Sequence, residues 1–260
     1  MPKLYAKTVA VQTVTEGQRE TMYRLMGQYY DCMDYGRFVK DLDGKDDVIL
    51  LLDGKTHSIK GFSTLKSMEV SDGGSKAYGI FSGDTVVDRA YWGQKVLGVA
   101  FLKYLFMKKT QRPFSPLYWL LISKGYKTYL LMANNFSNHY PRFEEQTPKH
   151  EQSLIDGFAN MLFGQSYHQD RGVVEFEQSL GQLRPGIADV PSSAAFKNPR
   201  IAYFAQQNPD WMNGTELVCI AEMTFGMPLY YVLKRWWKLA LRPWVRQISQ
   251  PTVTTVEPRG

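Results

Sequence analysis

The chain has 260 residues, 44% of them hydrophobic and 14% aromatic, so it can bury a full core and wholesale disorder is excluded. Its net charge of +6 favours an anionic partner, such as a phosphorylated cofactor, an acidic carrier protein, a lipid surface or a nucleic acid, or serves solubility alone. Its only cysteines, Cys32 and Cys219, argue against a disulfide framework and a structural zinc site, and they suit a reducing cytoplasm.

The first third of the chain predicts a strand, a helix and a three-stranded meander. Residues 3–14 alternate apolar and polar side chains, which predicts a strand, and residues 15–30 predict a helix capped by Thr15. Turn signals follow at the Asp-Gly pair that starts at Asp53 and around Gly73. The three strands that these turns connect are expected at residues 47–53, 58–68 and 78–87.

A glycine-containing loop then leads into a helix expected at residues 96–109. Such a junction is a common phosphate site, because the N–H groups at a helix N-terminus are unpaired and the helix dipole is positive there. Lys95 and Arg89 can neutralise a phosphate, and Trp92 can narrow the groove. The alternative is an ordinary strand–turn–helix in which Gly93 serves the tight turn.

The remaining elements alternate between helix and strand. Residues 117–123 are expected to form a short helix and residues 126–133 a strand, before the polar and aromatic segment 134–144. Beyond residue 145 the pattern weakens. The expected features there are a helix at 151–163, a short strand at 172–176, a long loop at 181–193, and regular pieces at 201–208 and 216–223.

The order and the residues of these elements resemble the GCN5-related N-acetyltransferase superfamily over residues 1–145, as a divergent member with a C-terminal extension. The resemblance implies an α/β fold: a mixed, mostly antiparallel central sheet flanked by helices, with an α-rich C-terminal extension. It divides the chain into an acyltransferase core at residues 1–145, an extension over the acceptor side at 146–225, and an amphipathic helix and tail at 226–260.

In that superfamily the fourth strand offers backbone groups to the pantetheine arm of acyl-CoA, and the following loop wraps the pyrophosphate. Here Gly93 lies where a glycine often precedes the motif, Lys95 stands at the first motif glycine, and Gly98 matches the last with a one-residue slip. The cofactor-binding residues that the resemblance implies are Val86, Val87, Arg89, Trp92, Gly93, Gln94, Lys95, Val96, Leu97 and Gly98.

The resemblance also implies an asparagine and a tyrosine after the fifth strand, the tyrosine protonating the departing thiolate. Asn134 or Asn135 and Tyr140 match that spacing, and a phenol with a pKa of about 10 can return a proton to sulfur as the C–S bond breaks. The alternative is that Tyr140 is a half-buried aromatic at a strand exit. For the general base, no spacing singles out one residue among Glu69, Asp84, Asp88, His139 and His168.

The function that the resemblance implies is N-acyl transfer from a CoA or acyl-carrier-protein thioester to a small amine. Acyl-CoA or acyl-phosphopantetheine would be a cosubstrate, with no permanently bound cofactor. Lys103, Lys108 and Lys109 on the basic helix suggest an acidic carrier protein and a long acyl chain, although they suit a plain solvated face equally. The alternative function is a non-catalytic acyl-CoA-binding or peripheral membrane-associated protein that keeps the same cleft.

Other protein classes lack their motifs. The chain has no HExxH, GxSxG, GxxxxGK[ST] or GxGxxG, which argues against a metal site, a serine hydrolase and a nucleotide enzyme. Its scattered lysines and arginines argue against nucleic-acid binding.

The tail and the N-terminus bear on location. Residues 227–244 predict an amphipathic helix whose tryptophans and cations suit a membrane surface, or else a helix that packs on the core or on a dimer partner. The sequence shows no signal peptide and no run of ~20 apolar residues, so the protein is expected in the cytoplasm. Peripheral contact with the inner face of the membrane is the alternative left open by the tail.

Overall fold

The computed structural model describes residues 3–31, 33–72, 75–176, 182–183 and 197–227. The chain divides into two compact units, residues 1–224 and 225–260, and every helix and strand named below belongs to the first. The amphipathic helix predicted in the tail and most of the loop predicted at 181–193 therefore fall outside the described residues. No described helix is long and apolar enough to cross a bilayer.

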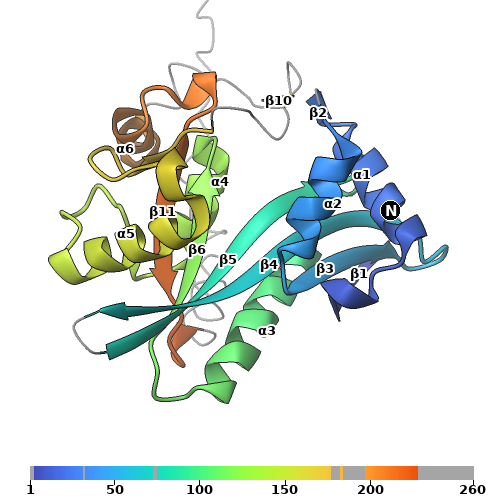
Figure 1. Cartoon of the computed structure of the whole chain (residues 1–260), viewed down its shortest axis with the longest axis horizontal. Helices are drawn as coiled ribbons and strands as arrows, with labels where there is room; N and C mark the ends of the chain where they lie inside the picture. Colours follow the sequence, from blue (N-terminus) through green and yellow to red (C-terminus); the bar gives the residue numbers. More distant parts are fainter. Residues whose placement is uncertain (1–2, 32, 73–74, 177–181, 184–196, 228–260) are drawn as a thin grey trace, which may run out of the picture. The chain divides into compact units, whose positions relative to one another are not determined.

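A central sheet organises the first unit (Figure 1). Among the described residues it has nine strands, in the order β1-β3-β4-β5-β6-β11-β9-β8, with β7 paired to β11 beside this path. Every neighbouring pair is antiparallel except β5 and β6, which are parallel, so the predicted mixed, mostly antiparallel sheet is confirmed. The strands are β1 Leu4–Ala10, β3 Asp47–Asp53, β4 Ile59–Asp72, β5 Ser75–Val87, β6 Leu117–Ser123, β7 His139–Tyr140, β8 Tyr167–His168, β9 Val173–Val174 and β11 Glu216–Glu222. A separate pair joins β2 Tyr30–Asp31 to β10 Gln182–Leu183.

Helices cover both faces of the sheet, and the alternation of β6 side chains shows which helix lies on which face. Leu120 packs in a core with α5, whereas Trp119, its neighbour in the strand, makes an edge contact with Phe101 of α3 at 4.9 Å between ring centroids. A second core joins α1 and α2 to β3, β4 and β5. The helices are α1 Glu16–Met26, α2 Tyr35–Asp43, α3 Val96–Gln111, α4 Tyr126–Asn135, α5 Lys149–Phe163 and α6 Pro199–Gln207.

Two predicted elements are wrong, and they are neighbours in the chain. Residues 117–123 form strand β6 instead of a short helix, and residues 126–133 lie in helix α4 instead of a strand. Strand β6 is central, with six of its seven residues buried, so its sequence is a continuous apolar run that periodicity cannot distinguish from a buried helix. Helix α4 buries Tyr129, Met132 and Ala133 at the helical spacings i, i+3 and i+4.

The other predicted elements are found with shifted ends. Strand β1 ends at Ala10, where a 3₁₀ turn at Val11–Thr13 follows, and α1 begins after a capping box between Thr15 and Gln18 as expected. Helix α2 was not predicted. Strand β11, from the predicted extension, pairs with β6 and so lies inside the sheet, which joins the segments 1–145 and 146–225. The three-part division of the chain stays a prediction.

Candidate active site

The parallel strands β5 and β6 separate along their length. Their pairing runs from Tyr78 opposite Leu117 to Phe81 opposite Leu120 and stops there, although β5 continues to Val87 and β6 to Ser123. The far edge of β6 remains paired to β11 as far as Ser123, so the strand itself is intact. Figure 1 shows the two ribbons diverging toward α4. The strand that opens from β5 is thus β6, not the segment 126–133 for which the sequence predicted this role.

A β-bulge lies in β5 where the separation begins. Ser82 is opposite Leu65 and Thr85 is opposite Ser63, so Gly83 and Asp84 together face the single residue Thr64. The extra residue shifts the alternation of side chains. Ser82 accepts a 2.8 Å hydrogen bond from Trp119 on the α3 face, and Gly83 lies over Thr64 and Lys45 on the opposite face. The bulge therefore turns Asp84 toward the α2 face, away from α3.

A cavity of about 480 Å³ occupies the opening. The bulge of β5, the end of β6 and the first turn of α4 form one side of it, and α1, α2 and α5 contribute the other. Its lining divides into a charged part and an apolar part. The charged and polar lining includes Tyr30, Asp41, Lys45, Asp84, Lys124, Tyr126, Lys127 and Glu216.

The charged part contains two ion pairs and one carboxylate outside them. Lys45 Nζ lies 2.7 Å from Asp41 Oδ1, and Lys124 Nζ lies 3.3 Å from Glu216 Oε1. Asp84 has neither a hydrogen bond nor an ion pair with any described residue. A half-buried carboxylate that faces a cavity without a partner is unusual, because desolvation of its charge is then uncompensated.

Both acidic groups nearest the opening hold protons more tightly than usual. Burial raises the pKa of Asp84 to about 6, the neighbouring Asp41 charge adds to this, and Lys45 and Lys124 oppose it. Burial likewise raises the pKa of Glu216 to about 6, against the pull of Lys124. A carboxylate with a pKa near 6 is ionised at neutral pH and yet basic enough to accept a proton, as general bases must be.

The apolar part of the cavity is a continuous aromatic wall, composed of Phe81, Phe163 and Phe176. Phe81 and Phe163 meet edge to face with ring centroids 5.6 Å apart, and Phe163 meets Phe176 in the same way at 6.0 Å. All three rings line the cavity, with Leu162 beside them. The charged and apolar parts of the lining adjoin, because Lys45 Nζ lies 5.9 Å from the centroid of the Phe81 ring.

The predicted phosphate loop lies outside this cavity, none of its residues being among the cavity's lining. Trp92 is exposed, and its indole Nε1 donates a 2.7 Å hydrogen bond to the Val87 carbonyl while Arg89 lies over its ring at 5.7 Å. Gln94 accepts a 3.1 Å hydrogen bond from the backbone of Leu4, which ties the loop to β1. Val86 is buried in the core of α1 and α2.

The end of the loop presents the N-terminus of α3. Gly93 has φ +84°, a left-handed conformation that favours glycine, and Lys95 is the N-cap residue. No side chain caps this 16-residue helix, and its first turn, with Val96, Leu97 and Gly98, holds no acidic residue. The first N–H groups of a helix have no partner within it, so this end is left with a positive potential.

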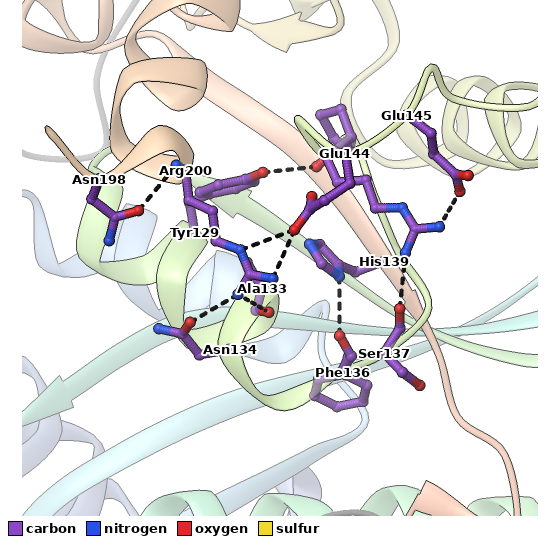
Figure 2. Close-up of polar contacts among 12 residues, drawn as sticks. Tyr129, Ala133, Asn134, Phe136, Ser137, His139, Glu144, Glu145, Asn198 and Arg200 are labelled. Atoms are coloured by element: carbon purple, nitrogen blue, oxygen red, sulfur yellow. Dashed lines mark hydrogen bonds and ion pairs between the residues drawn. The ribbon is translucent and has the colours of Figure 1, made fainter. Parts of the chain in front are cut away.

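Of the predicted catalytic residues, Asn134 lies in a different polar group, around Arg200 (Figure 2). Arg200 donates to the Asn134 side chain at 2.9 Å and to Glu144 at 2.8 Å. The Asn135 side chain donates 2.6 Å to the carbonyl of Leu131, and the Tyr140 hydroxyl donates 2.7 Å to Glu145. None of Asn134, Asn135 and Tyr140 is among the residues that line the cavity, so the structure does not bring them to the strand opening.

His139 lies within the same polar group and is 2% exposed. Its Nδ1–H donates to the Phe136 carbonyl at 3.0 Å, and its Nε2 has no hydrogen-bond partner among the described residues. Burial lowers the pKa of His139 to about 4, the Phe136 hydrogen bond opposes this, and the Arg200 charge adds to it. The imidazole is therefore neutral at physiological pH. His139 is not among the residues that line the cavity.

Of the five candidate bases, only Asp84 lines the cavity. Glu69 lies 2.6 Å from Lys76, Asp88 accepts from the backbone of Ala90, and His168 lies 3.7 Å from Glu175. The four residues of the cavity's two ion pairs were not among the predicted site residues: Asp41, Lys45, Lys124 and Glu216. No sequence signal groups them, because α2 was not predicted and β11 is brought to β6 from ~90 residues away by the fold.

No metal site accompanies these groups in the part of the chain that the structure describes, where no three His, Cys, Asp or Glu side chains gather in a way that could hold an ion.

Comparisons with known proteins find only solved structures of low similarity to this chain. No protein-family model and no curated protein sequence matches the chain. A conserved protein of Enterococcus faecalis V583 described as a probable N-acyltransferase is similar at 13% identity and a TM-score of 0.41, over 53% of this chain and 33% of that one. A Trypanosoma brucei acetyltransferase gives 14% identity and a TM-score of 0.38, over 56% and 100% of the two chains. A ribosomal-protein-alanine N-acetyltransferase of Brucella melitensis biovar Abortus 2308 gives 13% and 0.37, over 51% and 90%.

All three neighbours are named as acyl- or acetyltransferases, and the chain spans a third of the length of the first of them. At such identities and TM-scores their activities are not carried over to this protein.

Proposed function

We propose that the protein transfers an acyl group from a thioester, CoA or acyl-phosphopantetheine, to a primary amine. The observation that carries this proposal is the opening between β5 and β6, which holds a cavity and the partnerless carboxylate of Asp84. Backbone groups on the facing edges of the opened strands have no ladder partner in each other. The opening suits a polar, extended molecule that can hydrogen-bond along a strand edge.

In this proposal the pantetheine arm lies along the free edge of β5. From Ser82 to Val87 the strand spans ~16 Å at ~3.3 Å per residue, a length that suits an extended arm. The strand then leads into the loop and to the uncapped N-terminus of α3, where the pyrophosphate would be held by helix amides and by Lys95. The thioester carbonyl would lie at the bulge and be polarised by strand N–H groups.

The reaction is direct attack of the amine on the thioester carbonyl within a ternary complex. Asp84 accepts one proton from the ammonium form of the acceptor, which frees the lone pair of its nitrogen. The free amine then attacks, the new C–N bond forms and the C–S bond breaks. The second proton that the nitrogen loses balances the proton that the thiolate takes up, so an amide and a free thiol are the products. Holding the two reactants side by side supplies most of the acceleration, and proton transfer to Asp84 adds to it.

The donor is proposed to be CoA instead of a carrier protein. Two of the three lysines that suggested an acidic carrier are engaged within the chain: Lys108 lies 3.5 Å from Asp47, and Lys109 is buried and donates 2.7 Å to the Ser115 carbonyl. Only Lys103 is exposed to solvent. The basic face of α3 is therefore smaller than the sequence suggests, which weakens the case for a carrier protein.

The function is tested by measuring free-thiol release from acetyl-, octanoyl- and palmitoyl-CoA with pooled primary amines. Amine-dependent thiol release supports transfer, and the preferred chain length identifies the donor. Binding of acyl-CoA without thiol release in any amine pool contradicts the proposal and supports the alternative, a non-catalytic acyl-CoA-binding protein.

Charge reversal at the helix N-cap tests the donor site. Lys95→Glu is expected to raise the KM for acyl-CoA about tenfold, or ~1.4 kcal/mol, with kcat nearly unchanged, because it opposes an anion that binds equally in ground and transition states. Lys103→Glu makes the same change of charge at an exposed position of the same helix and serves as the control. Equal KM values in both variants would contradict binding of the pyrophosphate at the N-terminus of this helix.

Two tyrosines compete for the role of general acid to the thiolate. Tyr126, in the first turn of α4, lines the cavity, whereas Tyr140 is hydrogen-bonded to Glu145 and does not. We expect Tyr126→Phe to lower kcat at least tenfold without changing the KM for acyl-CoA, and Tyr140→Phe to leave both constants unchanged. The reverse result would identify Tyr140 as the general acid to the thiolate and would support the predicted group of Asn134, Asn135 and Tyr140.

A further inference from the structure

The lining of the cavity carries information about the acceptor, beyond the fact that it is an amine. Building on the proposed acyl transfer, we propose that the acceptor is a small amine with one positive charge and an aromatic or branched alkyl body. Its ammonium group would lie against Asp84 and its body against the wall formed by Phe81, Phe163 and Phe176.

The charge of the acceptor follows from the pairing of charges in the cavity. The pair Asp41–Lys45 and the pair Lys124–Glu216 are each neutral, with N–O separations of 2.7 and 3.3 Å. They flank Asp84, because both lysines act on its charge. Asp84 alone is left outside the pairs, so these five side chains together carry one negative charge, and the exposed Lys127 is the further cation of the lining.

A single ammonium is the natural complement to that charge. An ionised carboxylate in a partly buried position is costly unless an opposite charge or hydrogen-bond donors compensate it. Lys45 and Lys124 act on the charge of Asp84 only from within their own ion pairs, and no described residue forms a hydrogen bond or an ion pair with Asp84. Lys127, which also lines the cavity, is exposed and is not among the charges that act on Asp84. An ammonium group brings both a charge and donors to the one position that needs them.

The body of the acceptor follows from the wall. The three phenylalanine rings are in contact in series, and Leu162 extends the apolar surface. Phe163 and Phe176 remain partly exposed, so this surface is open to the cavity. Burying an apolar ligand there gains ~25 cal/mol for each Å² removed from water, which a short or polar amine cannot gain. The volume of about 480 Å³ suits a small molecule.

The same wall could instead hold the acyl chain of the donor, and the two occupants predict different results. The test uses the full chain and titrates four probes by calorimetry: 2-phenylethylamine, 2-phenylethanol, ethylamine and phenylalanine. The first has both the charge and the ring, the second lacks the charge, the third lacks the ring, and the fourth adds a carboxylate that cancels the net charge.

We expect 2-phenylethylamine to bind at least tenfold more tightly than each of the other three. Asp84→Asn should weaken 2-phenylethylamine about tenfold and leave 2-phenylethanol unchanged, while Glu69→Gln, a carboxylate of the same hairpin away from the cavity, should change neither. Equal affinity for the amine and the alcohol, tighter binding of phenylalanine, or no amine binding up to about 10 mM would overturn the proposed class of acceptor.

Phe163→Ala separates the acceptor from the acyl chain. It should weaken 2-phenylethylamine severalfold and leave ethylamine unchanged, with Phe176→Ala as a second variant on the same wall. A changed preference among acetyl-, octanoyl- and palmitoyl-CoA, with unchanged amine affinity, would assign the wall to the donor and overturn the proposal.

The binding experiments need no thioester, so the proposed class of acceptor and the proposed acyl transfer can be refuted separately. Selective binding of cationic aromatic amines without thiol release would keep the amine site and refute acyl transfer. Thiol release that depends on other amines, without selectivity for a charge and a ring, would keep acyl transfer and refute this class of acceptor.

Discussion

Replacing Asp84 by asparagine is expected to lower kcat about a hundredfold, and at the same time to make the protein more stable at pH 7. The loss of activity follows from the loss of the proposed proton acceptor, since a general base contributes about 10²–10⁴-fold to a rate. Asparagine keeps the shape of the side chain but cannot accept the proton. The KM for acyl-CoA should change little, because the proposed contact of Asp84 is with the acceptor and not with the CoA moiety.

The gain in stability follows from linkage. The pKa of Asp84 is raised to about 6 in the folded protein from an ordinary value of 3.8, so the ionised form destabilises the fold. The penalty is fully present above the folded pKa and disappears as the pH falls toward the unfolded pKa, where both states are protonated. Because the carboxylate is only half buried, we expect the variant to gain about 1–2 kcal/mol at pH 7 and nothing near pH 4.

Thiol-release kinetics and urea unfolding at pH 7 and pH 4 measure the two effects together. Glu69→Gln is the matched control, because Glu69 is a carboxylate of the same hairpin whose pKa is lowered by its hydrogen bond to Lys76. It should leave turnover unchanged and gain no stability. An Asp84→Asn variant with full activity would exclude this residue as the base, and one that is less stable at pH 7 would show that Asp84 has a partner in the fold.

Mild acid is expected to destabilise the protein through His139. The pKa of this buried imidazole is lowered to about 4, whereas an unfolded histidine has a pKa of 6.5. Between these two values the unfolded chain binds the extra proton and the folded chain does not, so stability is lost as the pH falls from 6.5 toward 4. At pH 5 the loss amounts to ~2 kcal/mol, at 1.36 kcal/mol for each pH unit below 6.5.

The measurement compares the pH dependence of the unfolding free energy in the wild type and in His139→Asn, whose amide can still donate to the Phe136 carbonyl. The variant should be less stable overall, because it is smaller, but its curve should lack the loss between pH 6.5 and 5. Asp84 and Glu216 act in the opposite direction over this range and cancel in the comparison, since both chains contain them. Parallel curves would mean that the imidazole is protonated in the folded protein.

The sequence predicts those parts of the fold where local signals and tertiary packing agree. The meander of β3, β4 and β5 has alternating or apolar runs with turn residues between them, and α1 begins at a Thr–Gln capping box. The exchange of helix and strand at β6 and α4 has the opposite cause. A strand that is buried on both faces shows no alternation, so its identity depends on neighbours that the local sequence does not contain.

That exchange also separates the predicted catalytic residues from the strand opening. The prediction of Asn134, Asn135 and Tyr140 as catalytic residues depends on residues 126–133 being the strand that opens, and these residues lie in helix α4. The opening is one element earlier, beside β6, and its carboxylate is on the β5 bulge. A bulge depends on the pairing register of two strands, so no pattern within β5 alone identifies Asp84.

The position of β11 also constrains how the protein is made. Strand β6 emerges from the ribosome long before Glu216–Glu222, its neighbour in the finished sheet, is translated. At ~5–20 residues per second, synthesis of the intervening segment takes on the order of ten seconds, during which one edge of a mostly apolar strand is uncovered. Such an edge is a template for association with other nascent chains. Ribosome-bound chains arrested before residue 216 should therefore bind chaperones far more strongly than chains arrested well beyond residue 222.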